Sequence, residues 1–174
     1  MGQSNLEAFP ILTTERLTLR QLSENDVHEI FLLRSDTIIN WYLDRRPTHT
    51  LQAAMDFIKQ IKDKSLSYWA IEKNGNGNLV GTICLFNISE DLKSAEIGYE
   101  LLTQYQGDGI MEEAAKTVIQ YSTDVLRLST IDAYTHIGNQ GSSNLLKRLG
   151  FTISQDVDFG NADLVLYQLH SFLQ

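Results

Sequence analysis

The chain has 174 residues, of which 43% are hydrophobic and 21% charged, a balance that is typical of a single folded domain and excludes a disordered or collagen-like chain. Lys and Arg number 14 against 22 Asp and Glu, so the formal net charge is −8. The basic residues are scattered, which argues against a nucleic-acid ligand. An acidic surface favours cationic partners such as amines or basic proteins, with solubility alone as the alternative explanation.

Several features bear on location and metal binding. No window holds 18 consecutive apolar residues, so we expect no membrane-spanning helix and no membrane partner. Residues 1–6 lack the basic and apolar regions of a secretory signal. Cys84 is the one cysteine, which excludes internal disulfides and Cys-rich metal sites. We therefore expect a cytoplasmic, metal-free protein that forms one domain over 1–174, with its core at about 12–170. Cys84 is expected to be a buried strand cysteine, with a catalytic thiol as the alternative.

Apolar residues recur with strand or helix spacing along most of the chain. Ser23, with Asp26 three residues later, and Thr50 are typical helix N-caps. Asn and Gly at 74–78 accept the positive φ of tight turns and predict a hairpin. The expected elements are a strand at 16–21, helices after Ser23 and Thr50, strands at 67–73, 79–88 and 94–102, a helix at 110–126, a strand at 130–137, a helix at 142–149, and strands at 151–157 and 164–173. This order predicts an α+β fold with a mixed sheet of about seven strands.

The most informative segment, 104–110, lies between a predicted strand and a predicted helix. Gly107 and Gly109 allow a tight turn that presents successive N–H groups at the positive end of the helix dipole. Such a site suits a diphosphate, although a purely structural turn explains the glycines equally well. A P-loop is excluded because Ile110 follows Gly109, and a dinucleotide fingerprint because Glu112 occupies its third small-residue position.

The pattern Gln104-x-x-Gly107-x-Gly109 resembles the Q/R-x-x-G-x-G/A signature of the Gcn5-related N-acetyltransferases, the GNAT family. The wider sequence is similar to the branch that includes the ribosomal-protein N-terminal acetyltransferases. Three blocks carry this similarity: 13–20, 95–114, and 139–151 with its N-x-x-S…L-G-F pattern. The resemblance covers about residues 12 to 170.

The resemblance implies a GNAT fold, with helices on both faces of the sheet and a splayed pair of parallel strands, here 94–102 and 130–137. The pantetheine arm of acetyl-CoA, the implied co-substrate, would lie between these strands. Carried over by position, the resemblance implies a pyrophosphate site made of the motif residue Gln104 and the backbone N–H groups of Gln106, Gly107, Asp108, Gly109 and Ile110. The main chain of Leu102 would bind the pantetheine or acetyl carbonyl. Asn139 and Ser142 would face the thiol end of the cofactor, and Asn144 and Lys147 would lie near its adenosine-side arm. Asp108 departs from the family pattern, because a carboxylate beside phosphates is tolerable only if its side chain points into water.

Acetyl transfer to an amine needs a neutral amine, a polarised thioester carbonyl and a protonated leaving thiolate, without a covalent intermediate. Glu96 and Glu100 fall on one face of the same predicted strand and are candidate bases. In related acetyltransferases a strand glutamate near the Glu96 position works through water. His136 is a third candidate because of its natural pKa. A structural or substrate-positioning role is the alternative for each of the three.

Ser142 is the candidate acid by analogy, with a helix cap as its alternative role. Tyr134 and Tyr167 are further candidates, and each could instead only pack. The resemblance also implies that the segment with Trp41, Tyr42 and the basic pair at 45–46 shapes the acceptor pocket, unless its aromatic residues simply pack.

These features together predict an N-acetyltransferase that catalyses direct attack of an amine on acetyl-CoA in a ternary complex. The acceptor is a protein N-terminal amine, with ribosomal proteins among the candidates, or a small-molecule amine such as a polyamine or amino-sugar. The sequence does not decide whether the protein is a monomer or a homodimer. The alternatives are an acyltransferase that uses another acyl-CoA, such as succinyl-CoA, and a CoA-binding sensor without turnover.

Overall fold

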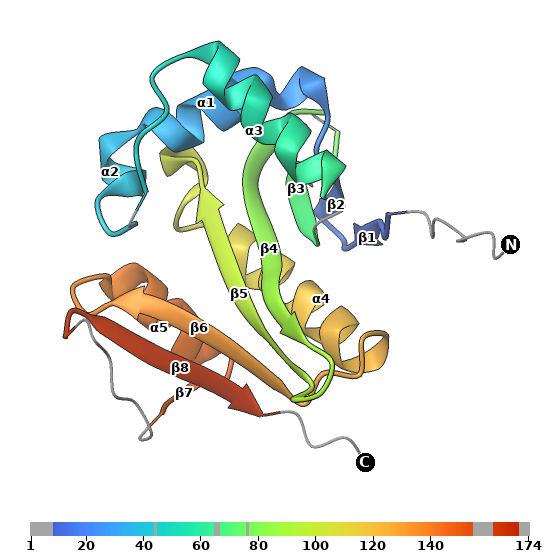
Figure 1. The fold of residues 1–174 in the computed structure, drawn as a ribbon, viewed down its shortest axis with the longest axis vertical. Coiled ribbons are helices and arrows are strands. Elements are labelled where there is room, and N and C mark those ends of the chain that lie inside the picture. Colours follow the sequence, from blue (N-terminus) through green and yellow to red (C-terminus); the bar gives the residue numbers. More distant parts are fainter. Residues whose placement is uncertain (1–8, 44, 65–66, 76, 155–161, 171–174) are drawn as a thin grey trace, which may run out of the picture.

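A computed structural model of the chain describes residues 9–43, 45–64, 67–75, 77–154 and 162–170. Within them, eight strands form one sheet in the order β1-β2-β3-β4-β5-β6-β8-β7 (Figure 1). The strands are β1 (Leu12–Thr13), β2 (Leu17–Gln21), β3 (Tyr68–Lys73), β4 (Leu79–Ser89), β5 (Ser94–Leu101), β6 (Thr130–His136), β7 (Thr152–Ile153) and β8 (Leu164–His170). The α-helices are α1 (Val27–Ser35), α2 (Thr37–Asn40), α3 (Leu51–Asp63), α4 (Ile110–Asp124) and α5 (Gln140–Arg148), and short 3-10 turns precede α1 and follow β5.

Helices cover both faces of the sheet, as predicted. One core lies between the sheet and helices α4 and α5, and it contains the fully buried Trp69 and Ile83 together with Ala114. The second core lies between the other face and helices α1 and α3, where Ile30 and Ile58 are fully buried. The alternation of side chains along each strand sends consecutive residues to opposite cores. The mixed α+β sheet is therefore confirmed.

The local signals predicted most element boundaries. The Thr50 hydroxyl accepts a hydrogen bond from the N–H of Ala53 at 3.1 Å, which confirms the predicted cap of α3. The Ser23 N–H donates to Asp26 Oδ2 at 2.7 Å, as expected for a cap before α1. The hairpin around 74–78 is also confirmed, because β3 and β4 pair in antiparallel fashion.

Other boundaries differ from the prediction. The segment after α1 forms an additional helix, α2, whose N-terminal amides are capped by the Asp36 side chain. Helix α5 begins at Gln140 rather than at residue 142, because Asn139 is its cap. Of the strand expected at 151–157, the described part is β7 alone, and 155–157 lie outside the described residues. The strand expected at 164–173 is described as far as His170.

Strands β5 and β6 form the splayed parallel pair. They pair at three positions, Ser94 with Thr130, Ala95 with Ile131 and Glu96 with Asp132. In the described chain this pairing does not continue beyond Glu96 and Asp132, and the two strands diverge into a V (Figure 1). On their outer edges β5 stays paired with β4 and β6 with β8. The inner edges of the V thus present backbone groups that a bound extended ligand could pair with.

None of the helices in the described ranges is both long and apolar enough to span a membrane. The same residues hold no group of three His, Cys, Asp or Glu side chains placed to bind a metal ion.

Candidate active site

A cleft of about 810 Å³ opens where β5 and β6 have separated, a volume in the range of small-molecule sites. Its walls come from the end of β5, the loop at 106–109 (the glycine loop), the start of α4, helix α5 and the segment around α2. The lining residues are Ile38, Ile39, Tyr42, Leu43, Tyr99, Glu100, Leu101, Gln106, Gly107, Gly109, Ile110, Met111, Glu112, Asn139, Gly141, Ser142, Asn144, Leu145 and Arg148.

The glycine loop presents free amide groups to this cleft. Gly107 and Gly109 have φ of 90° and 74°, a left-handed conformation that favours glycine. Gly109 is the N-cap of α4, and the first intrahelical bond runs from the Glu113 N–H to the Gly109 carbonyl at 3.1 Å. The N–H groups of the first turn therefore have no partner within the helix. This donor set, at the positive end of a 15-residue helix, fits a diphosphate.

Residues of the turn between β1 and β2 hold the glycine loop in place. The Arg16 guanidinium donates to the Asp108 carbonyl at 3.1 Å and to Glu113 Oε2 at 2.6 Å. The Thr14 hydroxyl donates to the other oxygen of Glu113. Although partial burial opposes it, these bonds from Thr14 and Arg16 lower the pKa of Glu113. The Asp108 side chain is exposed, which is the condition under which a carboxylate here is tolerable.

The predicted donor-binding residues fall into two groups. Those that line the cleft are Gln106, Gly107, Gly109, Ile110, Asn139 and Asn144. Those outside the lining are Leu102, Gln104, Asp108 and Lys147. Lys147 was expected to lie near the ligand, but the basic residue of α5 that lines the cleft is its neighbour Arg148. The signal for Arg148 was available in the sequence, because a spacing of four places it on the same helical face as Asn144.

The main chain of Leu102 is already committed to protein hydrogen bonds. Its N–H donates to the Val80 carbonyl at 3.0 Å, and its carbonyl accepts from the Tyr105 N–H at 2.9 Å. Its side chain is buried in the core beneath α1 and α3. These contacts argue against the predicted bond from Leu102 to the donor, and the neighbouring Leu101 lines the cleft instead.

An ion pair crosses the donor end of the cleft. Arg148 Nε on α5 lies 2.8 Å from Glu112 Oε2 in the first turn of α4, and Lys116 Nζ lies 2.8 Å from the other Glu112 oxygen. These two cations lower the pKa of Glu112. The Arg148–Glu112 pair joins α5 to the first turn of α4, which directly follows the glycine loop.

Ser142 faces a tyrosine that the sequence did not single out. The Ser142 and Tyr99 hydroxyls lie 2.9 Å apart, and both residues line the cleft. Burial raises the pKa of Tyr99 to about 12, so its hydroxyl is protonated at neutral pH. The alternative role of Ser142 as helix cap belongs instead to Asn139, whose Oδ1 accepts from the Ser142 N–H at 3.1 Å. Strand alternation alone could have placed Tyr99 on the face opposite Glu96 and Glu100.

The two candidate bases on β5 lie in different surroundings. Glu96 is half-buried at the narrow end of the V, outside the cleft lining, and its Oε1 accepts from Asn87 Nδ2 at 2.7 Å. Glu100 is 7% exposed at the wide end and lines the cleft. Its Oε2 is paired with Arg45 at 2.5 Å, and its Oε1 accepts from the Thr82 hydroxyl at 3.2 Å. Glu100 is thus fully engaged, whereas Glu96 has one bonded oxygen among the described contacts.

The remaining candidates lie around these groups. His136 Nδ1 accepts from the Gly138 N–H at 3.0 Å, and its ring centroid lies 5.1 Å from that of Tyr42. Tyr134 is 45% exposed, and burial together with the nearby Glu96 and Asp132 carboxylates raises its pKa. Tyr167 is buried in the core.

Cys84 is half-buried in β4. Burial and the Glu100 carboxylate raise the pKa of its thiol to about 12. The thiolate that a nucleophilic cysteine requires is therefore disfavoured, which supports the expected structural role over the catalytic alternative.

Comparisons with known proteins agree with this fold. Residues 16–152 match the family described as the acetyltransferase (GNAT) domain. An uncharacterized N-acetyltransferase of Bacillus subtilis, YoaA, is 31% identical over 82% of this chain and 83% of its own length. The spermidine N(1)-acetyltransferase of Escherichia coli K12 is 24% identical over 80% of this chain and 74% of its own.

A solved structure of RimL, a ribosomal L7/L12 alpha-N-protein acetyltransferase in complex with coenzyme A, superposes with a TM-score of 0.77. It is 19% identical, and the superposition covers 92% of this chain and 98% of that one. The family match spans more than half of the sequence, and the splayed sheet that the resemblance implied is present. This chain therefore belongs to the GNAT family and is an N-acetyltransferase.

Proposed function

We propose that the protein transfers the acetyl group of acetyl-CoA directly to a primary amine in a ternary complex. The observation that carries this proposal is the V between β5 and β6, which ends at a loop of left-handed glycines and free helix N-terminal amides. When bound, acetyl-CoA would supply the activated acetyl thioester. Amides from Gly107 to the first turn of α4 would bind its diphosphate, and the inner edge of β5 would pair with its pantetheine amides.

Tyr99 and Ser142 form the proposed acid. Their hydroxyls are hydrogen-bonded to each other at 2.9 Å in the cleft, so a proton given by one can be replaced through the other. A buried tyrosine with a raised pKa holds its proton until strong negative charge develops nearby. The departing thiolate is such a charge.

Glu96 is the proposed base, acting through water. Its carboxylate lies on the strand face away from Tyr99, outside the cleft lining, so a water molecule would have to bridge it to the amine. Asn87 holds one of its oxygens at 2.7 Å and leaves the other available. Glu100, with both oxygens engaged, is the weaker candidate.

A protein N-terminus is the proposed acceptor. Both carboxylates in the cleft lining, Glu100 and Glu112, are already paired with cations, which leaves little there to attract a polyamine. Exposed apolar side chains stand beside the cleft on and after α2, namely Ile38 at 69% and Trp41 at 77% exposure, and they suit a peptide segment. RimL, similar in structure, acts on such an amine.

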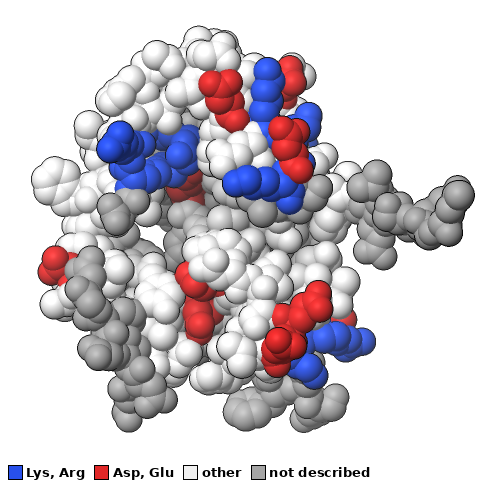
Figure 2. Space-filling model, viewed as in Figure 1, with Lys and Arg blue, Asp and Glu red and all other residues white. Residues whose placement is uncertain are grey.

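A polycationic small molecule is the second candidate acceptor. Glu96 and Asp132 are partners in the register of β5 and β6. Figure 2 shows acidic side chains over these two strands, in the hollow that faces the basic residues near α2. The relative that acetylates spermidine makes this candidate worth testing beside the first.

The test measures free CoA release from acetyl-CoA with a panel of acceptors. It compares peptides with a free N-terminus, the same peptides with a blocked N-terminus and no internal lysine, and spermidine. Release with only the free peptides supports the proposal, and release with only spermidine favours the second candidate. Thermal stabilisation by acetyl-CoA without release on any amine would indicate a sensor, and faster release from succinyl-CoA would indicate a different acyl donor.

A further inference from the structure

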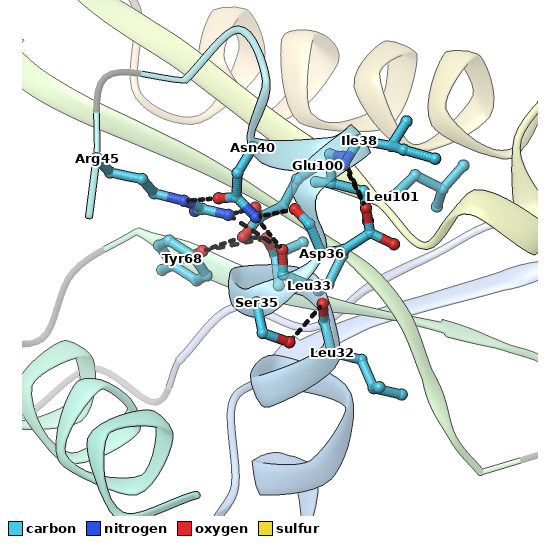
Figure 3. Close-up of polar contacts among 12 residues, drawn as sticks. Leu32, Leu33, Ser35, Asp36, Ile38, Asn40, Arg45, Tyr68, Glu100 and Leu101 are labelled. Atoms are coloured by element: carbon cyan, nitrogen blue, oxygen red, sulfur yellow. Dashed lines mark hydrogen bonds and ion pairs between the residues drawn. The ribbon is translucent and has the colours of Figure 1, made fainter. Parts of the chain in front are cut away.

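One guanidinium joins three segments at the acceptor side of the cleft. Arg45 Nη2 donates to Glu100 Oε2 at 2.5 Å and to the Leu33 carbonyl at 3.3 Å, and Arg45 Nε donates to Asn40 Oδ1 at 2.5 Å. Figure 3 shows this side chain reaching between the end of α1, helix α2 and β5. The planar fork of arginine makes these bonds at the same time, which a lysine ammonium on a single stem cannot reproduce.

Helix α2 depends on polar contacts for its position. It has four residues, and Ile38 and the following Trp41 are largely exposed, so Ile39 is its one apolar side chain packed against the core of the described residues. Asn40 is buried and donates to the carbonyls of Leu33 and Asp36 at 3.0 and 2.6 Å. Arg45 therefore holds the residue that ties α2 to the end of α1.

The same segment forms one wall of the cleft. Ile38 and Ile39 of α2, with Tyr42 and Leu43 just after it, are lining residues. The glycines proposed to bind the donor belong to a different part of the lining, at the start of α4. A shift of α2 would thus reshape the acceptor side and leave the donor side in place.

Glu100 is the fixed end of this arrangement. Its side chain is 5% exposed, and its second oxygen accepts from the Thr82 and Tyr68 hydroxyls at 3.2 and 3.5 Å. Those donors lie on β4 and β3, inside the sheet. Through Asn40 and Arg45, the ion pair thereby connects the short helix α2 to the interior of the sheet.

A second arginine, Arg34, also interacts with the charge of Glu100. Its guanidinium packs over the Phe57 ring at 4.0 Å, and its buried Nε has no hydrogen-bond partner within the described residues. Burial and the nearby Arg45 lower the pKa of Arg34, whereas Glu100 opposes that shift. Glu100 is thus ion-paired with Arg45, and its negative charge also favours the charged form of Arg34.

We propose that Arg45 is a positioning residue that sets the acceptor wall of the cleft by tying α2 to Glu100, and that Glu100 anchors it rather than acting as a base. The inference rests on the proposed amine acetylation. It predicts that disturbing the pair changes acceptor recognition while acetyl-CoA binding is kept.

The test compares Arg45→Lys with Arg46→Lys as the matched control. The resemblance implied a pocket role for the segment that contains Arg46, but the structure leaves Arg46 exposed and outside the cleft lining. For Arg45→Lys we expect a KM for the amine acceptor raised roughly tenfold or more, because a small misplacement of a binding wall is costly, and a KM for acetyl-CoA within about twofold of the wild type. Arg46→Lys should match the wild type. An unchanged acceptor KM, or an equal rise in both KM values, would overturn the proposal. Should Arg45→Lys fail to fold, Glu100→Asp, which keeps the charge but withdraws the carboxylate, is held to the same criteria.

Two further measurements separate this proposal from others. A pH profile of kcat/KM for Glu100→Gln should keep its acidic limb, and loss of that limb would make Glu100 the base. Amide hydrogen exchange in a peptide covering residues 37–43 should be faster in Arg45→Lys than in Arg46→Lys, and equal rates would contradict the anchoring role. Exchange needs no turnover, so it tests Arg45 even if the wild type acetylates no amine, an outcome that would count against the proposed function alone.

Discussion

The hydroxyl of Tyr99 on β5 lies 2.9 Å from that of Ser142 on α5, and the two residues come from opposite sides of the cleft. Neither hydroxyl is needed to cap a helix, because Asn139 caps α5. Hydroxyls that are partly removed from water favour a hydrogen-bond partner, and here the two half-buried hydroxyls satisfy each other. The pair therefore has no capping role in α5, which supports the acid function proposed for it.

Ser142→Ala should lower kcat by roughly tenfold or more and leave acetyl-CoA binding nearly unchanged, because the lost hydrogen bond matters mainly in the transition state. Tyr99→Phe is the matched partner variant, and the double variant should lose little more than either single one if the hydroxyls act as a unit. Steady-state kinetics and melting curves measure both effects. Full kcat in Ser142→Ala, whatever its stability, would end the catalytic assignment.

Glu96→Gln should reduce kcat by roughly 10²-fold near neutral pH, since an amide cannot accept the amine proton. The loss should shrink at high pH, where the amine is already neutral. Asp132→Asn, the register partner of Glu96, controls for the removal of one negative charge from the same face. The measurement is a pH–rate profile of the wild type, Glu96→Gln and Asp132→Asn. If kcat of Glu96→Gln stays within a factor of two of the wild type, the base role passes to His136.

Gly109→Val should abolish the rise in melting temperature that acetyl-CoA produces in the wild type, because ligands that bind only the native state stabilise it. A side chain at φ of 74° strains the loop and crowds the amides that would meet the phosphates. Gly75→Val is the control, because Gly75 also has positive φ but open space around it in a distant turn. Thermal denaturation with and without acetyl-CoA compares them, and an undiminished shift in Gly109→Val would place the phosphates elsewhere.

Glu113→Gln should make the melting temperature less dependent on pH on the acidic side. The bonds from Thr14 and Arg16 lower the pKa of Glu113 below its ordinary value of 4.5, against the opposing effect of partial burial. A depressed native pKa contributes stability that is present above the unfolded value and is lost as pH falls through the native one. The variant should thus be less stable than the wild type at pH 7, and the difference should narrow below about pH 4.5. If the melting temperatures of the two proteins changed with pH in the same way across that range, the depressed pKa of Glu113 would be refuted.

The sequence by itself determined the local features of the structure, namely those that depend only on residues close together in the chain. The turn at 74–78 needs the positive φ that Gly and Asn accept, and the periodicity of 110–126 predicted α4. Thr50 caps the helix that begins at the next residue by accepting from the N–H of Ala53. The pair Gly107 and Gly109 also belongs to this class, since glycine permits the left-handed φ that both positions adopt. The α+β class and the order of the main elements follow from such local signals.

Only the tertiary structure decided which side chains meet. Tyr99 and Ser142 are 43 residues apart, and Arg45 and Glu100 are 55 apart. Strand alternation assigns Tyr99 and Glu100 to opposite faces but does not say which helix or loop covers each face. Helix α2 is too short to show a period, so its contribution to the cleft could not be predicted. Contacts at such separations depend on how the strands splay and the helices pack, because the whole chain stabilises that packing and no local segment specifies it.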